Sequence, residues 1–122
     1  MDRVFMTVGA ISAFVAVAAG AFGAHGLRAR LGPELLAIFE VGVRYQMYHA
    51  FGLFVAAWAC AKWPGVYTGL SGWMFITGTV VFSGSLYVLA LTGMRWLGAI
   101  TPFGGLAFLA GWLMLAWGIW RS

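Results

Sequence analysis

The chain has 122 residues, of which 63% are hydrophobic and only 8% are charged. Soluble domains have about a quarter of their residues charged, so this composition excludes an ordinary soluble domain and indicates an integral membrane protein. At about 20 apolar residues per span, the length allows four transmembrane helices joined by short loops. The net charge of +4 comes from basic residues at the ends of apolar runs. Such residues anchor helices at lipid headgroups, so we expect no nucleic-acid partner.

The first predicted span covers residues 4–24 and is rich in glycine and alanine. Its apolar stretch is too long for the hydrophobic region of a cleaved signal peptide, so we interpret it as a membrane helix. Small residues let helix backbones approach closely in lipid. We therefore expect helix-packing roles for five glycines in this and later spans: Gly20, Gly23, Gly84, Gly104 and Gly105.

Residues 34–44 follow the helix breaker Gly32-Pro33 and mix apolar side chains with Glu34, Glu40 and Arg44. Glu40 and Arg44 are four residues apart, in the order that favours an ion pair on one helix face. The pattern predicts a short amphipathic helix at the membrane interface, with Gly42 as the bend point. The second span then covers residues 45–61.

The remaining spans are predicted at residues 67–91 and 97–120, separated by a tight turn around Arg95. The expected fold is an all-α membrane protein with four transmembrane helices in a compact bundle. Because consecutive spans alternate in direction, both termini and the turn after residue 61 lie on one membrane face, which we call the terminal face. The connection 25–44 and the Arg95 turn lie on the opposite membrane face, which we call the loop face. Lys and Arg number three on the terminal face and four on the loop face, so the positive-inside rule leaves the orientation open.

The polar residues of the spans fall on the loop face or in the half-membrane beneath it, at one depth. Polar and ionisable groups inside a bilayer are energetically costly and therefore functional candidates. The predicted polar cluster comprises His25, Arg44, Tyr45, Gln46, His49, Ser83, Ser85, Tyr87 and Thr101. We expect His25, Arg44, Gln46 and His49 to approach Ser83, Ser85, Thr101 and Pro102 in space.

The sequence disfavours three chemical roles for this cluster. His25 and His49 with Glu34 or Glu40 lack the short ligand spacings of a metal site, so no metal or other cofactor is expected. A relay through the membrane lacks titratable groups in the terminal half, although an oligomeric pore stays open. Ser83 or Ser85 with His49 could form a nucleophile and base, but helical serines more often bond back to their own helix. We expect no enzyme.

Two functions stay open. The first is a structural or partner-docking membrane component, in which the cluster locks the helices together and a homo-oligomer or another membrane protein is the partner. The second is binding of an anionic lipid or small amphiphile at the loop face, with basic side chains at the edge of an aromatic pocket. The chain has one cysteine, Cys60, so no intramolecular disulfide can form.

Four ordered motifs stand out at residues 20–27, 39–50, 82–93 and 97–105. Together they resemble the bacterial domain of unknown function 423 family, which is related to the eukaryotic transmembrane protein 256 family. The resemblance implies a small four-helix protein of the bacterial inner membrane and supplies no activity, since the family is named for lacking one. The residues that match in place are Gly23, His25, Gly26, Tyr45, Gln46, His49, Ser83, Ser85, Tyr87, Thr101, Pro102 and Gly104.

Overall fold

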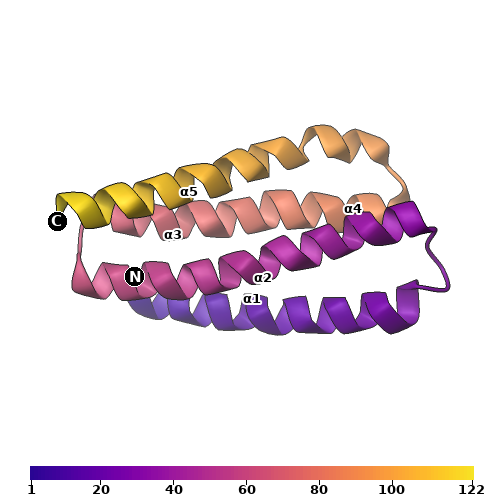
Figure 1. The fold of residues 1–122 in the computed structure, drawn as a ribbon, viewed down its shortest axis with the longest axis horizontal. Coiled ribbons are helices and arrows are strands. Elements are labelled where there is room, and N and C mark those ends of the chain that lie inside the picture. Colours follow the sequence, from indigo (N-terminus) through magenta and orange to yellow (C-terminus); the bar gives the residue numbers. More distant parts are fainter.

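The computed structural model describes all residues 1–122, and its fold is all-α. Four long helical segments run up and down the bundle (Figure 1). The first is α1 (Asp2–Phe22), extended by the π-helical turn η1 (Gly23–Leu27). The second is α2 (Pro33–Lys62). The third joins α3 (Val66–Gly78), the π-helical turn η2 (Thr79–Ser83) and α4 (Gly84–Thr92). The fourth is the 3₁₀ turn η3 (Arg95–Ala99) with α5 (Thr101–Arg121).

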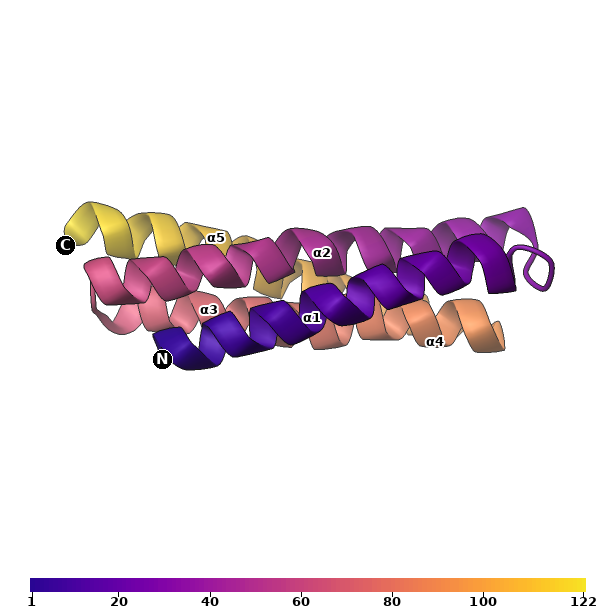
Figure 2. The ribbon, with the colours of Figure 1, turned by 90° about the horizontal axis from the view of Figure 1, so that it is seen from below.

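The two ends of the bundle carry the connections that the sequence predicts. Both termini and the α2–α3 connection lie at one end, and the α1–α2 and α4–α5 connections lie at the other (Figure 1). Helix α2 is central: it runs alongside α1, and its other side packs on α3, η2 and α4 (Figures 1 and 2). Helix α5 packs on α3 and η2 but makes few contacts with α2. The four-helix, all-α prediction is confirmed.

Three of the four segments are long and apolar enough to cross a membrane, namely Asp2–Leu27, Val66–Thr92 and Arg95–Arg121. Helix α2 is not among them. Its first turns carry charges and its middle carries Gln46 and His49, which lower its mean hydropathy. At 30 residues it is nevertheless long enough to span a bilayer, and it lies alongside the other three. A fourth span in α2 stays a prediction.

The predicted interfacial helix 34–44 is wrong as a separate element, because these residues form the first turns of one continuous helix. Gly42 is buried and lies against α4, and a β-carbon there would be 2.9 Å from the ring of Tyr87. Its carbonyl also accepts a hydrogen bond from the Ser83 hydroxyl at 2.7 Å. Gly42 therefore allows α2 to approach α4 and η2 closely, and it does not act as a bend point.

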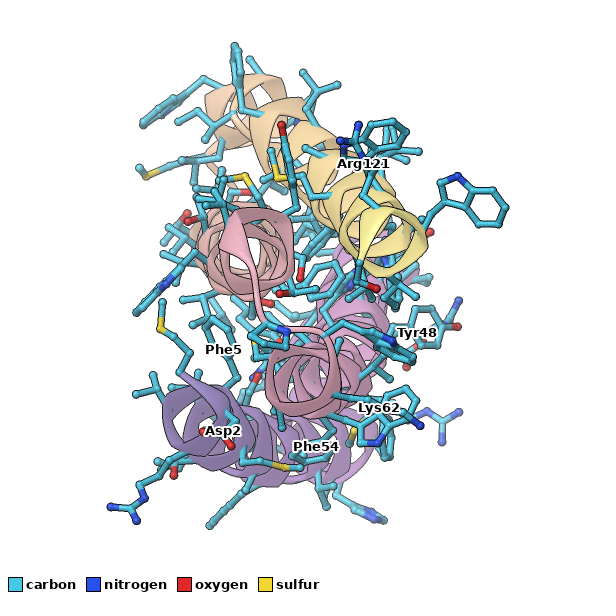
Figure 3. All side chains as sticks on the ribbon, turned by 90° about the vertical axis from the view of Figure 1, so that its left-hand side faces the viewer. Asp2, Phe5, Tyr48, Phe54, Lys62 and Arg121 are labelled. Atoms are coloured by element: carbon cyan, nitrogen blue, oxygen red, sulfur yellow. The ribbon has the colours of Figure 1, made fainter.

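Close packing also joins the α1–α2 pair of helices to the α3–α5 side of the bundle. Phe5 of α1 is fully buried and fills the space left by Gly72 of α3, where a β-carbon would overlap its ring. Seen from the terminal face in Figure 3, Phe5 lies inside the bundle, whereas Lys62 and Arg121 lie at its end. Lys62 sits over the rings of Trp58 and Trp63. Such cation–aromatic pairs suit a membrane interface, as predicted for this face.

Candidate functional site

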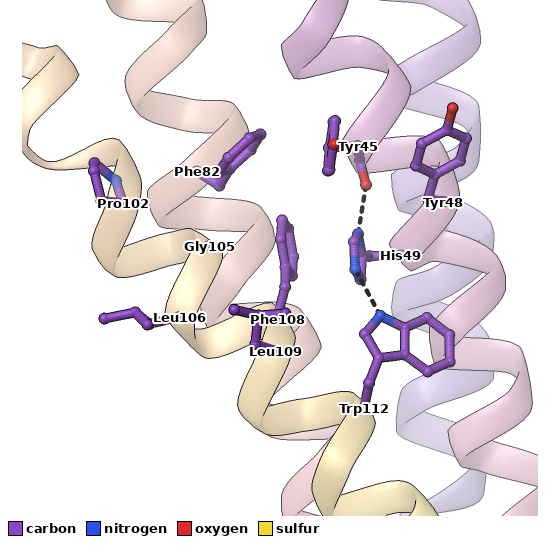
Figure 4. Close-up of a pocket in the computed structure, with 10 residues that line it drawn as sticks. All are labelled: Tyr45, Tyr48, His49, Phe82, Pro102, Gly105, Leu106, Phe108, Leu109 and Trp112. Carbon is purple, nitrogen blue, oxygen red and sulfur yellow. Dashed lines mark hydrogen bonds between the residues drawn. The ribbon is translucent and has the colours of Figure 1, made fainter.

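Helices α2 and α5 diverge and leave a groove of about 700 Å³ between them, which we call the α2–α5 groove. It opens on the side of the bundle, and η2 contributes to its wall (Figure 4). Most of its side chains are aromatic and none carries a formal charge with histidine neutral. The lining residues are Tyr45, Tyr48, His49, Phe82, Pro102, Gly105, Leu106, Phe108, Leu109 and Trp112.

His49 is buried on the inner side of this groove, where two hydrogen bonds and one stacked ring fix its side chain. Its Nδ1 lies 2.8 Å from the carbonyl oxygen of Tyr45, and the indole Nε1–H of Trp112 donates to its Nε2 at 3.1 Å (Figure 4). Because the indole only donates, Nε2 must accept and the proton must sit on Nδ1. The ring also stacks on Phe108, with centroids 3.5 Å apart and planes 5° from parallel. The geometry therefore fixes one neutral tautomer, and neither nitrogen is free for a ligand.

Tyr45 and Tyr48 contribute the free polar groups of the groove. Their rings are 5.4 Å apart, and 38% and 51% of these residues is exposed. Neither hydroxyl makes a hydrogen bond within the chain, whereas the Tyr87 hydroxyl does. A phenol in apolar surroundings normally finds a partner. The groove thus offers two unused hydrogen-bonding groups beside aromatic walls.

A separate group of polar side chains crosses between helices away from the groove. The Gln46 amide nitrogen donates to the Ser12 carbonyl of α1 at 2.9 Å, and the Gln46 amide oxygen accepts from the Tyr87 hydroxyl of α4 at 2.5 Å. The Ser83 hydroxyl donates to the carbonyl of Gly42, joining the last residue of η2 to α2. We call Ser12, Gly42, Gln46, Ser83 and Tyr87 the polar lock. Its hydrogen bonds satisfy one another, so it holds three helices in register.

Ser85 and Thr101 join the fourth helix to this arrangement, with their hydroxyl oxygens 2.6 Å apart. Ser85 also donates to the carbonyl of Phe82, three residues earlier in the same chain segment. The predicted cluster therefore divides into a self-satisfied lock and a groove with free hydroxyls.

Comparison with known proteins places the chain in a family. The family model described as "Protein of unknown function (DUF423)" matches residues 19–105. The chain belongs to the DUF423 family. The resemblance predicted from the four motifs is confirmed. No solved structure matches the chain.

Relatives of this DUF423 protein cover nearly its whole length. The UPF0382 membrane protein YwdK of Bacillus subtilis is 48% identical over 114 residues, which is 93% of each chain. A UPF0382 membrane protein of Haemophilus influenzae is 38% identical over 122 residues, covering 100% of this chain and 98% of its own. The DUF423 protein is thus a bacterial membrane protein with several spans, as predicted.

Two residues of the predicted cluster lie elsewhere in the DUF423 protein. His25 is in η1, at the loop-face end of the first span, where it is exposed and makes no hydrogen bond. His49 lies sixteen residues after Pro33, about 24 Å along α2 at a rise of ~1.5 Å per residue. The expectation of one shared depth is therefore wrong, because the polar residues of α2 continue to its middle. Arg44 is exposed and lines a small hollow with Gly20, Gly23 and Glu40.

The serine–histidine pair considered from the sequence does not form in the DUF423 protein. Ser83 and Ser85 donate to backbone carbonyls, and both nitrogens of His49 are taken by Tyr45 and Trp112. His25 is also apart from His49, so the four candidate metal ligands are not brought together.

The five predicted packing glycines have different environments. A β-carbon at Gly104 would overlap the backbone of Phe82, and one at Gly23 would lie 3.0 Å from the ring of Phe39. Gly20 is looser, with Val43 at 3.4 Å. At Gly84 no atom lies within 4 Å, so this glycine makes no close helix contact and that prediction is wrong. Gly105 lines the groove, with the Phe82 ring at 3.9 Å.

Sequence reasoning missed three residues of the site: Ser12, Phe108 and Trp112. Phe108 and Trp112 are four residues apart on α5, a spacing that places them on one helix face. That spacing could have marked them as partners, but it does not identify His49 as the residue they face. Ser12 accepts from the Gln46 amide mainly through its backbone carbonyl, at 2.9 Å, and through its hydroxyl at 3.3 Å. A single serine in an apolar span does not indicate which helix it faces.

The loop face is closed by one ion pair, and it is not the predicted Glu40–Arg44 pair. Arg95 Nη1 lies 2.7 Å from Glu34 Oε1, joining the first turn of α2 to η3. The hydrogen bond and positive charge of Arg95 hold the pKa of Glu34 below its ordinary value. Both side chains are exposed, 69% for Glu34 and 64% for Arg95, so the pair contributes little to stability.

Replacing Glu34 by glutamine is expected to lower the melting temperature only slightly, and only at pH values at which Glu34 is charged. Since the folded-state pKa of Glu34 is depressed, its contribution is present above the unfolded-state pKa and is lost as the pH falls through the folded-state pKa. Thermal unfolding of wild type and Glu34→Gln should therefore differ at about pH 7 and converge in acid. Glu40→Gln is the control, because Glu40 has no ion-pair partner. A difference that persists in acid would contradict this account.

Proposed function

We propose that this DUF423 protein is a non-enzymatic membrane protein that binds an uncharged amphiphilic molecule in the α2–α5 groove. The observation that carries the proposal is a lateral groove whose rim holds two phenol hydroxyls without partners inside the chain. In lipid, each such hydroxyl lacks water as an alternative partner, so a ligand that accepts a hydrogen bond is favoured there.

The absence of charge in the groove favours an uncharged ligand over the anionic lipid that the sequence left open as an alternative. Arg44 lines the small hollow between α1 and α2, and Glu40 lines the same hollow. Arg95 is paired with Glu34. Neither cation reaches the α2–α5 groove, so an anionic headgroup would gain no compensating charge there.

The separation of lock and groove supports binding over a purely structural role for Tyr45 and Tyr48. The lock joins α1, α2 and α4 through groups whose hydrogen bonds are complete. The two tyrosines join no helices by hydrogen bonds, although Tyr45 packs on Phe82 with ring centroids 4.8 Å apart. Their hydroxyls can therefore serve a ligand without weakening the bundle. An apolar helix of a partner protein is the competing occupant of such a groove.

The test is photolabelling in lipid nanodiscs with hexadecanol that carries a diazirine in its chain. Wild type should be labelled preferentially on the groove segments of α2 and α5, as mapped by mass spectrometry of peptides. Gly105→Leu should reduce that labelling severalfold, because its side chain grows into the groove from a position with only ordinary contacts. Gly84→Leu is the matched control, since it adds the same side chain on open surface.

Two outcomes would count against the proposal. Labelling spread evenly over all lipid-facing helices, and equal in the three proteins, would show that the groove has no preference over bulk lipid. Groove segments that stay unlabelled while the protein runs as an oligomer or complex would instead indicate that a protein helix fills the groove.

A further inference from the structure

We infer that the ligand's polar end is a planar, uncharged ring bearing hydrogen-bond-accepting oxygens, carried on an apolar tail. Membrane quinones have this chemistry. The inference rests on the proposed function and deepens it by naming the class of molecule. It concerns binding and includes no electron transfer.

The hydrogen-bonding groups of the groove favour an acceptor on the ligand. The Nδ1–H of His49 is used by the Tyr45 carbonyl, and Nε2 is used by the Trp112 indole. The groove therefore has no free ring nitrogen to receive a proton or hydrogen bond from a ligand. What is left is the pair of hydroxyls on Tyr45 and Tyr48, which can both donate. Two carbonyl or ether oxygens would satisfy both.

The walls of the groove favour a flat ring over a flexible chain. The ring centroid of Tyr45 lies 4.8 Å from that of Phe82 and 5.4 Å from that of Tyr48. Both tyrosines are still substantially exposed. Offset stacking or edge-to-face contact with such rings adds to binding only when the ligand is itself aromatic or planar. An acyl chain packs against these walls but gains no ring stacking from them.

The depth of the groove favours a head with no charge. Tyr48 and His49 lie near the middle of α2, with Lys62 about 20 Å away at a rise of ~1.5 Å per residue. A hydrocarbon core is about 30 Å thick, so a phosphate or ammonium at this position would leave the headgroup region altogether. A neutral ring reaches this depth readily. Leu106 and Leu109 of α5, both largely exposed, extend the groove for the tail.

The test is competition against the diazirine hexadecanol label in nanodiscs, using decyl-1,4-benzoquinone and decylbenzene as probes with the same tail. In wild type the quinone should displace the groove label at a concentration about tenfold or more below that of decylbenzene. Tyr45→Phe and Tyr48→Phe should each shrink this ratio about threefold, because each removes one hydrogen bond and leaves the walls aromatic. Tyr67→Phe, outside the groove, is the control and should leave the ratio unchanged.

The outcomes separate this inference from the function on which it rests. Equal displacement by both probes in wild type would overturn the planar-acceptor inference and leave a groove that binds hydrophobic molecules without preference. An unchanged ratio in Tyr45→Phe and Tyr48→Phe would overturn the assigned donors. Failure of both probes, with no groove label in wild type, would overturn the proposed function itself.

Discussion

Alanine at Gly104 is expected to destabilise the bundle by about 1–3 kcal/mol, a range typical of overpacked sites. The β-carbon would fall 2.7 Å from the Cα of Phe82 and would overlap its backbone nitrogen. The obstacle is backbone in η2, which cannot swing aside as a side chain could. Helix α5 would have to move away from α3 and η2, which are its main packing partners.

Gly105→Ala is the matched control, one residue along the same helix. Its β-carbon would meet only the Phe82 ring at 3.9 Å, which is ordinary contact. It should therefore leave stability unchanged or raise it slightly through helix propensity. Thermal unfolding in detergent, followed by circular dichroism, compares the two variants directly. Equal melting temperatures for both would show that η2 and α5 are not as close as described.

Gln46→Leu is expected to destabilise the protein by about 1–2 kcal/mol, the range for hydrogen bonds between membrane helices. The change removes the bond to the Ser12 carbonyl and leaves the Tyr87 hydroxyl without its acceptor. Gln46 is 5% exposed, so lipid or water would not replace these partners readily. The measurement is the free energy of unfolding in mixed micelles.

A double-mutant cycle with Tyr87→Phe isolates the interaction. Because the two side chains share a hydrogen bond, the double variant should lose less than the sum of the single losses, by about 0.6–1.7 kcal/mol. A cycle of Gln46→Leu with Tyr67→Phe should be additive, since the Tyr67 hydroxyl has no hydrogen bond and lies at the terminal face. Additivity in both cycles would mean that the polar lock does not hold the helices.

The helices themselves were predictable because long apolar runs leave few alternatives. The run predicted at 67–91 corresponds to Val66–Thr92, and the run at 97–120 to Arg95–Arg121. The error at residues 34–44 has a physical origin. The charges and Gly42 favoured an interfacial segment with a bend, whereas the residues form one continuous helix in which Tyr87 packs on Gly42.

The division of the polar cluster could not be predicted in the same way. Tyr45 and Gln46 are neighbours in sequence, yet one lines the groove and the other bonds to α1 and α4. Consecutive residues of a helix point about 100° apart, so their neighbours depend on how the helices are arranged. That arrangement follows from close contacts such as Gly104 on Phe82, which apolar periodicity does not encode.

The central position of α2 has a consequence for how the protein is made. Transfer of an isolated segment into the bilayer becomes less favourable with each charged or strongly polar residue near its middle. Helix α2 has the least apolar composition of the four, and it follows directly after α1, which carries an acceptor for Gln46. If α2 is the fourth span, we therefore expect its insertion during biogenesis to depend on pairing with α1, so that α1 and α2 enter the membrane as one unit.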